Sequence, residues 1–535
     1  MEHQETKFSF VYNEVKQRIL NGQVLPGNSL PSSRMLCDQY HVSRYTVNRV
    51  FDALKKDGLI EIQPRLAPVV LDGEKMPGSE HILRDILKKR EGLVQIYRTW
   101  TLILPPLLVF ATQNCSLEMM PHYKQAMRVS RIGVAAGGWR AFSAFDRDVL
   151  KIGGSPLLCD LYSTFELYHD LTFFTEQCPC FYDFFPRGSV PFAGVIMDIM
   201  KDTDPVVKHG RLTALYQRLT SSIECTLKHL AETAPDCPPP SEAAFSWRPL
   251  RGKDYFYMRI ISDLNQKIGS GEYPRRTYLP HEKALAGQYG VSVSTVRKAL
   301  AELEQRGFVK TLNGKGTVVI EPDSSRVSQV IFSSRRTEEA MRYLQALQLL
   351  VLIIHPAALS AAPLFTAKEL DELDGKFAMP DSICIVEIVE AILKHIELEP
   401  LRIVLAETFR LTEWGYYIAY YTDRRQALED LNGRVAASVQ YLRAGDAASF
   451  ADSIADCYRH VLKRAKVYML ENYNFYKAAS VRIPENTERF APPGQRRRRG
   501  DKQETAPYMA VKPYKGRFAE SKYDGKAGCI LPFNL

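Results

Sequence analysis

Apolar residues recur at helical spacing near the start of the chain, and the same pattern returns in its second half. The segments Val11–Ile19 and Ile260–Ile268 each predict one amphipathic helix. Each helix precedes a longer segment, Leu30–Ile60 or Leu279–Val309, and these two align without a gap at an offset of 249 residues, the difference between Leu279 and Leu30. The identical pairs are Leu30 and Leu279, Pro31 and Pro280, Leu36 and Leu285, Gln39 and Gln288, Tyr40 and Tyr289, Val42 and Val291, Ser43 and Ser292, Thr46 and Thr295, Val47 and Val296, Leu54 and Leu303, and Gly58 and Gly307.

The first copy predicts a helix-turn-helix. Ser32 and Ser33 are suited to cap a short helix with Met35, Leu36 and Tyr40 on one face.

A second helix follows in the same copy, with Ser43 as its cap and Gly58 at its left-handed end. The segment Leu59–Ile62 is then expected to form a short strand. The apolar face of this second helix consists of Val47, Val50, Phe51 and Leu54.

The second copy repeats the plan and adds a clear hairpin. Two strand-like runs, Phe308–Leu312 and Thr317–Ile320, flank the turn Asn313–Gly316. Asn-Gly is typical of a type I′ turn, in which both central residues have positive φ. A helix-turn-helix followed by a hairpin is a winged helix. The apolar face of the second helix here consists of Val296, Ala299, Leu300 and Leu303.

These residues resemble the DNA-binding domain of the GntR-type bacterial transcription regulators. The resemblance covers Phe10–Leu71 and Tyr257–Glu321, and it includes the N-G-x-x-x-P-G-x-x-L-P-S segment at Asn21–Ser32 and the V-S-x-x-T-V core. The second copy departs from the family where Arg275-Arg276 replaces Pro-Gly. The first copy departs in the wing, where Pro64–Pro68 replaces Gly-x-Gly.

The resemblance implies that the second helix of each copy enters the major groove of DNA. Arginine suits guanine, asparagine suits adenine, and a threonine methyl packs on thymine. The candidate DNA-binding residues are Ser32, Arg34, Ser43, Arg44, Tyr45, Thr46, Asn48, Arg49 and Arg65 in the first copy, and Lys283, Ser292, Ser294, Thr295, Arg297, Lys298, Lys315 and Gly316 in the second.

The two copies are expected to recognise different half-sites. The family's arginine after V-S is present as Arg44 but replaced by Val293, and its later arginine is replaced by Asn48 but present as Arg297. A polar, solvent-exposed helix face is the alternative interpretation. The basic residues fall on the family's contact positions in both copies, which favours DNA contact.

The rest of the chain is predominantly helical, so the fold class is mainly α: two winged helix-turn-helix domains, each followed by an all-helical domain, in a tandem duplication. The duplication extends into the helical segments, where Leu102–Pro106 aligns with Leu352–Pro356, and Pro156–Phe165 is similar to Pro400–Phe409. The expected domains are winged helix 1 at 1–76, helical domain 1 at 80–236, a Pro-rich, semi-rigid linker at 237–252, winged helix 2 at 253–323, helical domain 2 at 328–480, and a disordered basic tail at 483–535.

The helical domains are similar to the effector-binding and dimerisation domain of the FadR-like branch of the family. The similarity lies in Phe145-Asp146 with Gly154–Leu158, and in Ala444–Ala447 before a final helix. It implies a small-molecule effector, whose pocket residues stay unassigned.

Many members of that branch hold a divalent metal with an Asp and three His. Here Phe142 occupies the position of the Asp and Asp146 that of the first His, with His209 and His229 as the remaining candidates. Two histidines and one carboxylate make a poor site, so we expect no metal and no other cofactor.

Composition restricts the function further. A net charge of +9 and a pI near 8.9 permit binding to polyanions. The N-terminus lacks an apolar signal segment, the longest apolar runs suit buried helices, and the ten cysteines lack zinc spacing. Free, buried thiols, a cytoplasmic location and no membrane partner are therefore expected.

The hypothesis from the sequence is a GntR-like transcription regulator that binds double-stranded operator DNA and is not an enzyme. We expect a monomeric pseudo-dimer with two non-identical heads, or alternatively a homodimer with four heads. A replication-initiator-like or architectural protein with tandem winged helices is the alternative function. A fused aminotransferase-like domain would need far more residues than either helical segment has, and the chain has no nucleophile elbow, P-loop or Rossmann glycine pattern.

Overall fold

The structure is a computed structural model. It describes residues 7–20, 24, 27–40, 42–63, 66–71, 79–132, 138–171, 173–178, 180–184, 192–234, 237–240, 245–247, 249, 257, 260–261, 263–265, 267–268, 271–321, 334–379, 382–412, 415 and 424–484. The chain divides into one unit at Met1–Ala491 and a second at Pro492–Leu535, and all of the predicted disordered tail except Ile483 and Pro484 lies outside the described residues.

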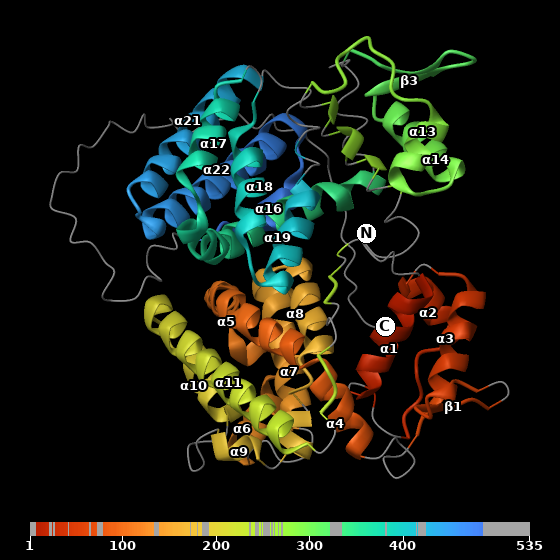
Figure 1. Cartoon of the computed structure of the whole chain (residues 1–535), viewed down its shortest axis with the longest axis vertical. Helices are drawn as coiled ribbons and strands as arrows, with labels where there is room; N and C mark the ends of the chain where they lie inside the picture. The colour runs from red at the N-terminus through yellow and green to blue at the C-terminus, as the bar shows by residue number, and fades with distance from the viewer. Residues whose placement is uncertain are drawn as a thin grey trace, which may run out of the picture. The chain divides into compact units, whose positions relative to one another are not determined.

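The fold is mainly helical, as predicted, with two winged helices and two helical regions (Figure 1). We call residues 7–71 head 1, residues 79–234 helical region 1, residues 257–321 head 2 and residues 334–480 helical region 2. The finer domain limits proposed from the sequence stay a prediction.

Head 1 consists of three helices and a two-stranded wing. Its elements are α1 (Lys7–Leu20), α2 (Ser33–Tyr40), α3 (Arg44–Lys56), β1 (Ile60–Glu61) and β2 (Val69–Val70). In head 2 the named elements are α13 (Glu282–Tyr289), α14 (Val293–Gln305), β3 (Val309–Leu312) and β4 (Gly316–Val319), and the predicted leading-helix residues Ile260, Leu264 and Ile268 are buried.

Serine caps and left-handed glycines set the limits of both recognition helices. The Ser43 hydroxyl accepts a hydrogen bond from the Thr46 amide at 3.2 Å, and Ser292 does the same for Thr295 at 3.3 Å. Gly58 (φ 71°) ends α3 and Gly307 (φ 77°) ends α14. Both ends are Schellman motifs, because the second residue beyond each C-cap donates back across the last turn: Leu59 N to Leu54 O at 3.0 Å and Phe308 N to Leu303 O at 3.1 Å.

The 249-residue offset holds for the wings as well. An isolated bridge adds a third backbone segment to each hairpin, Ser29 beside Val69 and Tyr278 beside Val318. The matched bonds are Gly27 N to Val70 O and Arg276 N to Val319 O, both 2.8 Å, and Leu30 N to Pro68 O at 2.7 Å and Leu279 N to Thr317 O at 2.8 Å.

Two details of the heads differ from what the sequence predicts. Met35 is 60% exposed, whereas Leu36 and Tyr40 are buried, because adjacent residues point about 100° apart on a helix. The hairpin of head 2 has a three-residue loop between Leu312 and Gly316, with positive φ at Gly314 and Gly316 but not at Asn313. The prediction of a type I′ turn was therefore wrong, although the hairpin itself is confirmed.

Helical region 1 is built on α5 (Arg90–Gln113), most of which is buried. It packs against α11 (Pro205–Thr233) and α8 (Pro156–Tyr168). Its other helices are α4 (Ser79–Lys88), α6 (Tyr123–Ile132), α7 (Gly138–Val149), α9 (Phe181–Phe184) and α10 (Phe192–Met200), with the short 3-10 helix η2 (Leu117–Met119) and the short π-helices η3 (Leu150–Gly154) and η4 (Phe173–Gln177).

The segment that follows α11 is anchored to helical region 1. Arg90 donates to the Pro238 carbonyl at 2.8 Å, and Trp247 is buried and donates through Nε1 to Asp160 at 2.9 Å. Part of the predicted semi-rigid linker is therefore packed against protein.

Helical region 2 is built on α16 (Ser334–Ala361), which packs against α22 (Ala447–Tyr473) and α19 (Glu399–Leu411). Pro356 lies inside α16, as Pro105 and Pro106 lie inside α5, which agrees with the alignment of these segments. The remaining elements are η6 (Ala362–Leu364), α17 (Ala367–Phe377), α18 (Cys384–His395), α21 (Arg424–Arg443) and η8 (Tyr476–Ser480).

Two of the described helices, Arg90–Gln113 and Thr337–Leu364, are long and apolar enough to cross a membrane. In their most apolar windows, 78% and 67% of residues are buried inside the protein, as is usual for core helices. The nine cysteines in the described part of the chain are free thiols, but the prediction that they are buried holds for Cys178, Cys384 and Cys457 and is wrong for Cys225 and Cys237, which are exposed.

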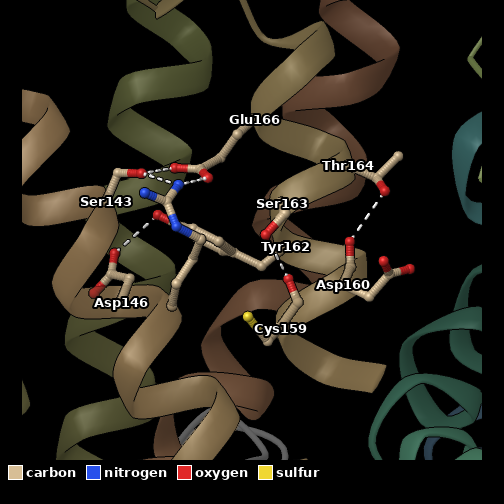
Figure 2. Close-up of polar contacts among 9 residues, drawn as sticks. Ser143, Asp146, Cys159, Asp160, Tyr162, Ser163, Thr164 and Glu166 are labelled. Atoms are coloured by element: carbon tan, nitrogen blue, oxygen red, sulfur yellow. Dashed lines mark hydrogen bonds and ion pairs between the residues drawn. The ribbon is translucent and has the colours of Figure 1, made fainter. Parts of the chain in front are cut away.

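A buried polar cluster lies between α7 and α8 (Figure 2). Glu166 accepts hydrogen bonds from Ser143 and from the Arg147 guanidinium, and Asp146 Oδ2 accepts one from the Tyr162 hydroxyl at 3.1 Å. Asp146 Oδ1 is buried without a hydrogen-bond partner. Burial raises the pKa of Asp146 well above its ordinary value, and the nearby charge of Glu166 adds to the increase.

We predict that Gly153→Ala destabilises the protein by about 1–3 kcal/mol. A Cβ at Gly153 would lie 2.1 Å from the Ala111 carbonyl oxygen, a backbone atom of α5 that cannot move alone. At neighbouring Gly154 the nearest atom to an added Cβ is Leu158 Cδ2 at 3.5 Å, so Gly154→Ala is the matched control and should be near neutral. Denaturant unfolding measures both, and equal effects would contradict the close approach of η3 to α5.

We predict that Asp146→Asn is more stable than the wild type at pH 7 and that this advantage shrinks as the pH falls toward about 4. The raised pKa keeps the folded carboxyl protonated to a higher pH than the unfolded carboxyl, which ionises above its ordinary pKa. The wild type therefore loses stability as the pH rises through that window, and asparagine does not. Thermal unfolding at several pH values tests this, with the exposed Asp52→Asn as control. An advantage that does not change with pH would mean that Asp146 is ionised in the folded protein.

Candidate nucleic-acid interface

The inward faces of α3 and α14 are buried, so their polar faces point to solvent. In head 1, Val47, Val50 and Leu54 are fully buried, and Val296, Ala299 and Leu303 are buried at the matching positions of head 2. Both helix N-termini are exposed and begin at a capping serine. The first-turn amides and the positive end of the helix dipole favour an anionic ligand such as a phosphate.

The candidate residues of head 1 gather around the start of α3. Arg44 and Asn48 are exposed, and Tyr45 is 72% exposed. The Ser32 hydroxyl accepts from the Met35 amide at 3.3 Å at the start of α2, where Arg34 is exposed.

The candidate Arg65 in the wing of head 1 lies outside the described residues, so its place remains a prediction.

Head 2 presents a different set at the same positions. Ser292 bonds to both Ser294 and Thr295 through their hydroxyls, at 2.8 and 2.9 Å. Lys283 is exposed on α13, and the wing places Lys315 and Gly316 at its exposed tip.

Arg297 on α14 forms an ion pair with Glu282 on α13, with 2.7 Å between Nε and Oε2. The Arg297 side chain remains 68% exposed.

The basic residues Arg49 and Lys298 hold the leading helix against the recognition helix. The Arg49 guanidinium lies 4.6 Å from the centroid of the Phe8 ring, and Lys298 Nζ lies 3.7 Å from that of the Tyr257 ring. Phe8 and Tyr257 are themselves 249 residues apart, so this is one cation–π contact present in both copies. Both residues were predicted to bind DNA, and this contact gives each a structural role as well.

An ion pair fixes the C-terminal end of each recognition helix, but the residue at this position is acidic in head 1 and basic in head 2. Asp57 in head 1 accepts from Lys16 Nζ at 2.8 Å and from the Tyr12 hydroxyl, both on α1. Burial disfavours the Asp57 carboxylate, but these hydrogen bonds hold its pKa below the ordinary value. Arg306, at the matching position of head 2, is 3% exposed and pairs with Glu302 at 3.0 Å and with Glu339 of α16 at 3.2 Å.

Sequence reasoning missed Glu282, Glu339 and the aromatic partners Phe8 and Tyr257. A signal for Glu282 was present, because two polar positions differ together between the copies: Ser33 and Asn48 in the first, Glu282 and Arg297 in the second.

The residues weighed for a metal site are spread through helical region 1. Phe142 is in the core, and Asp146 bonds to Tyr162. Burial, together with the nearby His355, lowers the pKa of His209 to about 4, and His229 packs against the Phe184 ring at 5.9 Å. Within the described ranges, no three His, Cys, Asp or Glu side chains gather in a way that could hold a metal ion.

Comparison with known proteins concerns the two heads. The family model "Bacterial regulatory proteins, gntR family" matches residues 7–70 and 256–319. The chain is 42% identical over 64 residues to the HTH-type transcriptional regulator TreR of Bacillus subtilis, a match that covers 12% of this chain and 27% of TreR. It is 35% identical over 78 residues to the histidine utilization repressor of Klebsiella aerogenes, which covers 15% and 32%. The chain spans about a third or less of the length of these relatives.

Two solved structures match this chain with low TM-scores. Streptococcus agalactiae GntR has 18% identity and a TM-score of 0.18, covering 39% of this chain and 99% of that protein. Escherichia coli McbR/YncC has 17% identity and a TM-score of 0.24, covering 39% and 96%. The two family matches, each on a serine-capped helix with an exposed polar face, carry the assignment. This chain therefore contains two winged helix-turn-helix domains of the GntR family of bacterial regulatory proteins.

Proposed function

We propose that this chain is a cytoplasmic transcription regulator that binds double-stranded DNA at specific sequences, with both heads reading base edges. The observation that carries the proposal is that both recognition helices are exposed and present different side chains, Arg44 and Asn48 on α3 and Arg297 on α14. Relatives of the heads are described as transcriptional regulators and repressors.

The two heads act as a covalent pseudo-dimer. Contacts between the helical regions support this arrangement, since α5 packs against both α16 and α19. The Glu399 amide donates to Gln95 Oε1 at 3.2 Å, and Arg482 donates to the Asn114 carbonyl. A tether of this kind gives the second head an effective concentration of the order of millimolar, so weak half-sites can be bound jointly.

A small molecule bound in the helical regions controls the spacing of the heads. The buried contact between Arg306 and Glu339 supports this part of the proposal, because it joins the end of α14 to the first turns of α16. A shift of α16 would be transmitted to the recognition helix of head 2 through this ion pair, which is costly to break because Arg306 is buried.

The alternative is a replication-initiator-like or architectural protein that binds iterated repeats. Selection of bound sequences from random DNA by the purified chain separates the two functions. Recovery of one two-part site supports the regulator, and recovery of many short direct repeats supports the initiator.

We predict that alanine at Arg44 weakens recognition of one half-site by about 1–3 kcal/mol and leaves the other intact, and that alanine at Arg297 does the reverse. The reason is that each arginine lies on only one recognition helix. Quantitative binding to selected sites at stated salt measures the effect, with the exposed Lys368→Ala of α17 as control. An equal loss for every sequence would mean that both side chains contact phosphate.

We predict that one chain protects two half-sites about one helical turn apart. Footprinting shows the protected bases, and a mass measurement of the complex gives the number of chains. Protection of a single half-site by the full chain would exclude the intramolecular arrangement. Two chains on one site would favour the homodimer with four heads.

A further inference from the structure

The Glu282–Arg297 ion pair lies on the exposed face of head 2 that the proposed function directs at DNA. Glu282 is the first residue of α13, Arg297 lies at the fifth position of α14, and the pair joins the two helices of the helix-turn-helix. The fully buried Leu285, Val296 and Leu303 already hold these helices together. The pair, in which Arg297 is exposed and Glu282 half-buried, is therefore not needed for packing.

The geometry of the pair leaves the end of the arginine available. Glu282 Oε2 accepts from Nε at 2.7 Å, so the carboxylate occupies the side of the guanidinium. The two terminal nitrogens keep their hydrogens for another acceptor, and a pair of parallel N–H groups matches O6 and N7 of guanine. The ion pair also restricts a long side chain that would otherwise lose much rotamer freedom on binding.

The first copy provides an internal comparison. Its counterparts of Glu282 and Arg297 are Ser33 and Asn48, which are too short and uncharged to form such a pair. Asparagine suits adenine instead of guanine. A carboxylate facing DNA without an arginine would repel the phosphates, so Glu282 is tolerable at this surface only together with Arg297.

We infer that Glu282 is a positioning residue for Arg297, and that this pair makes head 2 select guanine at the base-pair position where head 1, with Ser33 and Asn48, selects adenine. The inference rests on the proposed function and names the chemistry of its specificity. Glu282 itself contacts no base.

The test uses the full chain, a duplex with the selected half-sites, and guanine or adenine at the position read by head 2. The wild type should prefer guanine by about 5- to 150-fold. Glu282→Gln should lose most of that preference, while its affinity for random DNA does not fall, because the substitution removes a negative charge that faces the phosphates. Arg297→Lys keeps the positive charge but removes the pair of parallel N–H groups, so it should also lose the preference for guanine.

A double variant makes the test sharper. Arg297→Asn alone leaves Glu282 unpaired and should weaken binding to every sequence. Glu282→Ser with Arg297→Asn copies head 1, so it should recover affinity and prefer adenine. Circular dichroism and the melting temperature of each variant show whether head 2 is still folded, as expected because the buried core of the head is unchanged.

Three results would overturn the inference. An unchanged guanine preference in Glu282→Gln would mean that the ion pair has no part in recognition. A double variant that still prefers guanine would mean that other residues select the base. A wild type that selects no sequence above random DNA would instead refute the proposed function itself.

Discussion

The rotation of each recognition helix about its own axis is the constraint on which the rest of the structure depends. Val47, Val50 and Leu54 can be buried only in one rotational setting of α3, and that setting turns Arg44 and Asn48 outward. The same burial in head 2 turns Arg297 outward. Apolar packing inside the head therefore decides which polar groups a partner can meet.

The two heads have the same backbone conformation but differ in the residues at their surfaces. Caps, helix ends and wing hydrogen bonds recur at a constant offset, whereas the exposed positions have diverged. The attachments of the heads have also diverged, because Asp57 is paired within head 1 while Arg306 is paired with helical region 2. A duplicated domain can change what it contacts without changing how it folds, because the buried residues determine the fold and the exposed residues determine the contacts.

Local features of the fold were predictable from sequence. Ser43 and Gly58 act within one or two turns of helix, so their roles follow from their immediate neighbours. Met35 was assigned to the wrong face because residues 35 and 36 lie about 100° apart on a helix, and the turn at Asn313 was assigned the wrong type because loop length depends on the register of the strands.

The site was predictable only in part. Exposed basic residues on the recognition helices followed from the motif, but their partners did not. Glu282 is 15 residues from Arg297, Phe8 is 41 from Arg49, and Glu339 is 33 from Arg306. Contacts at such separations depend on how helices pack, and a single sequence contains little direct information about them.

One turn shows how far a motif can change while its structure is kept. Gly27 has a left-handed backbone (φ 79°), and the matching Arg276 keeps it (φ 65°) although arginine disfavours that region. The amide of each residue donates to the wing at 2.8 Å, so the backbone bond preserves the bend after the glycine has gone. A sequence motif that requires proline and glycine at this turn would therefore miss copies of the domain such as head 2. A comparison of structures that uses the backbone hydrogen bond to the wing and the serine cap would find them.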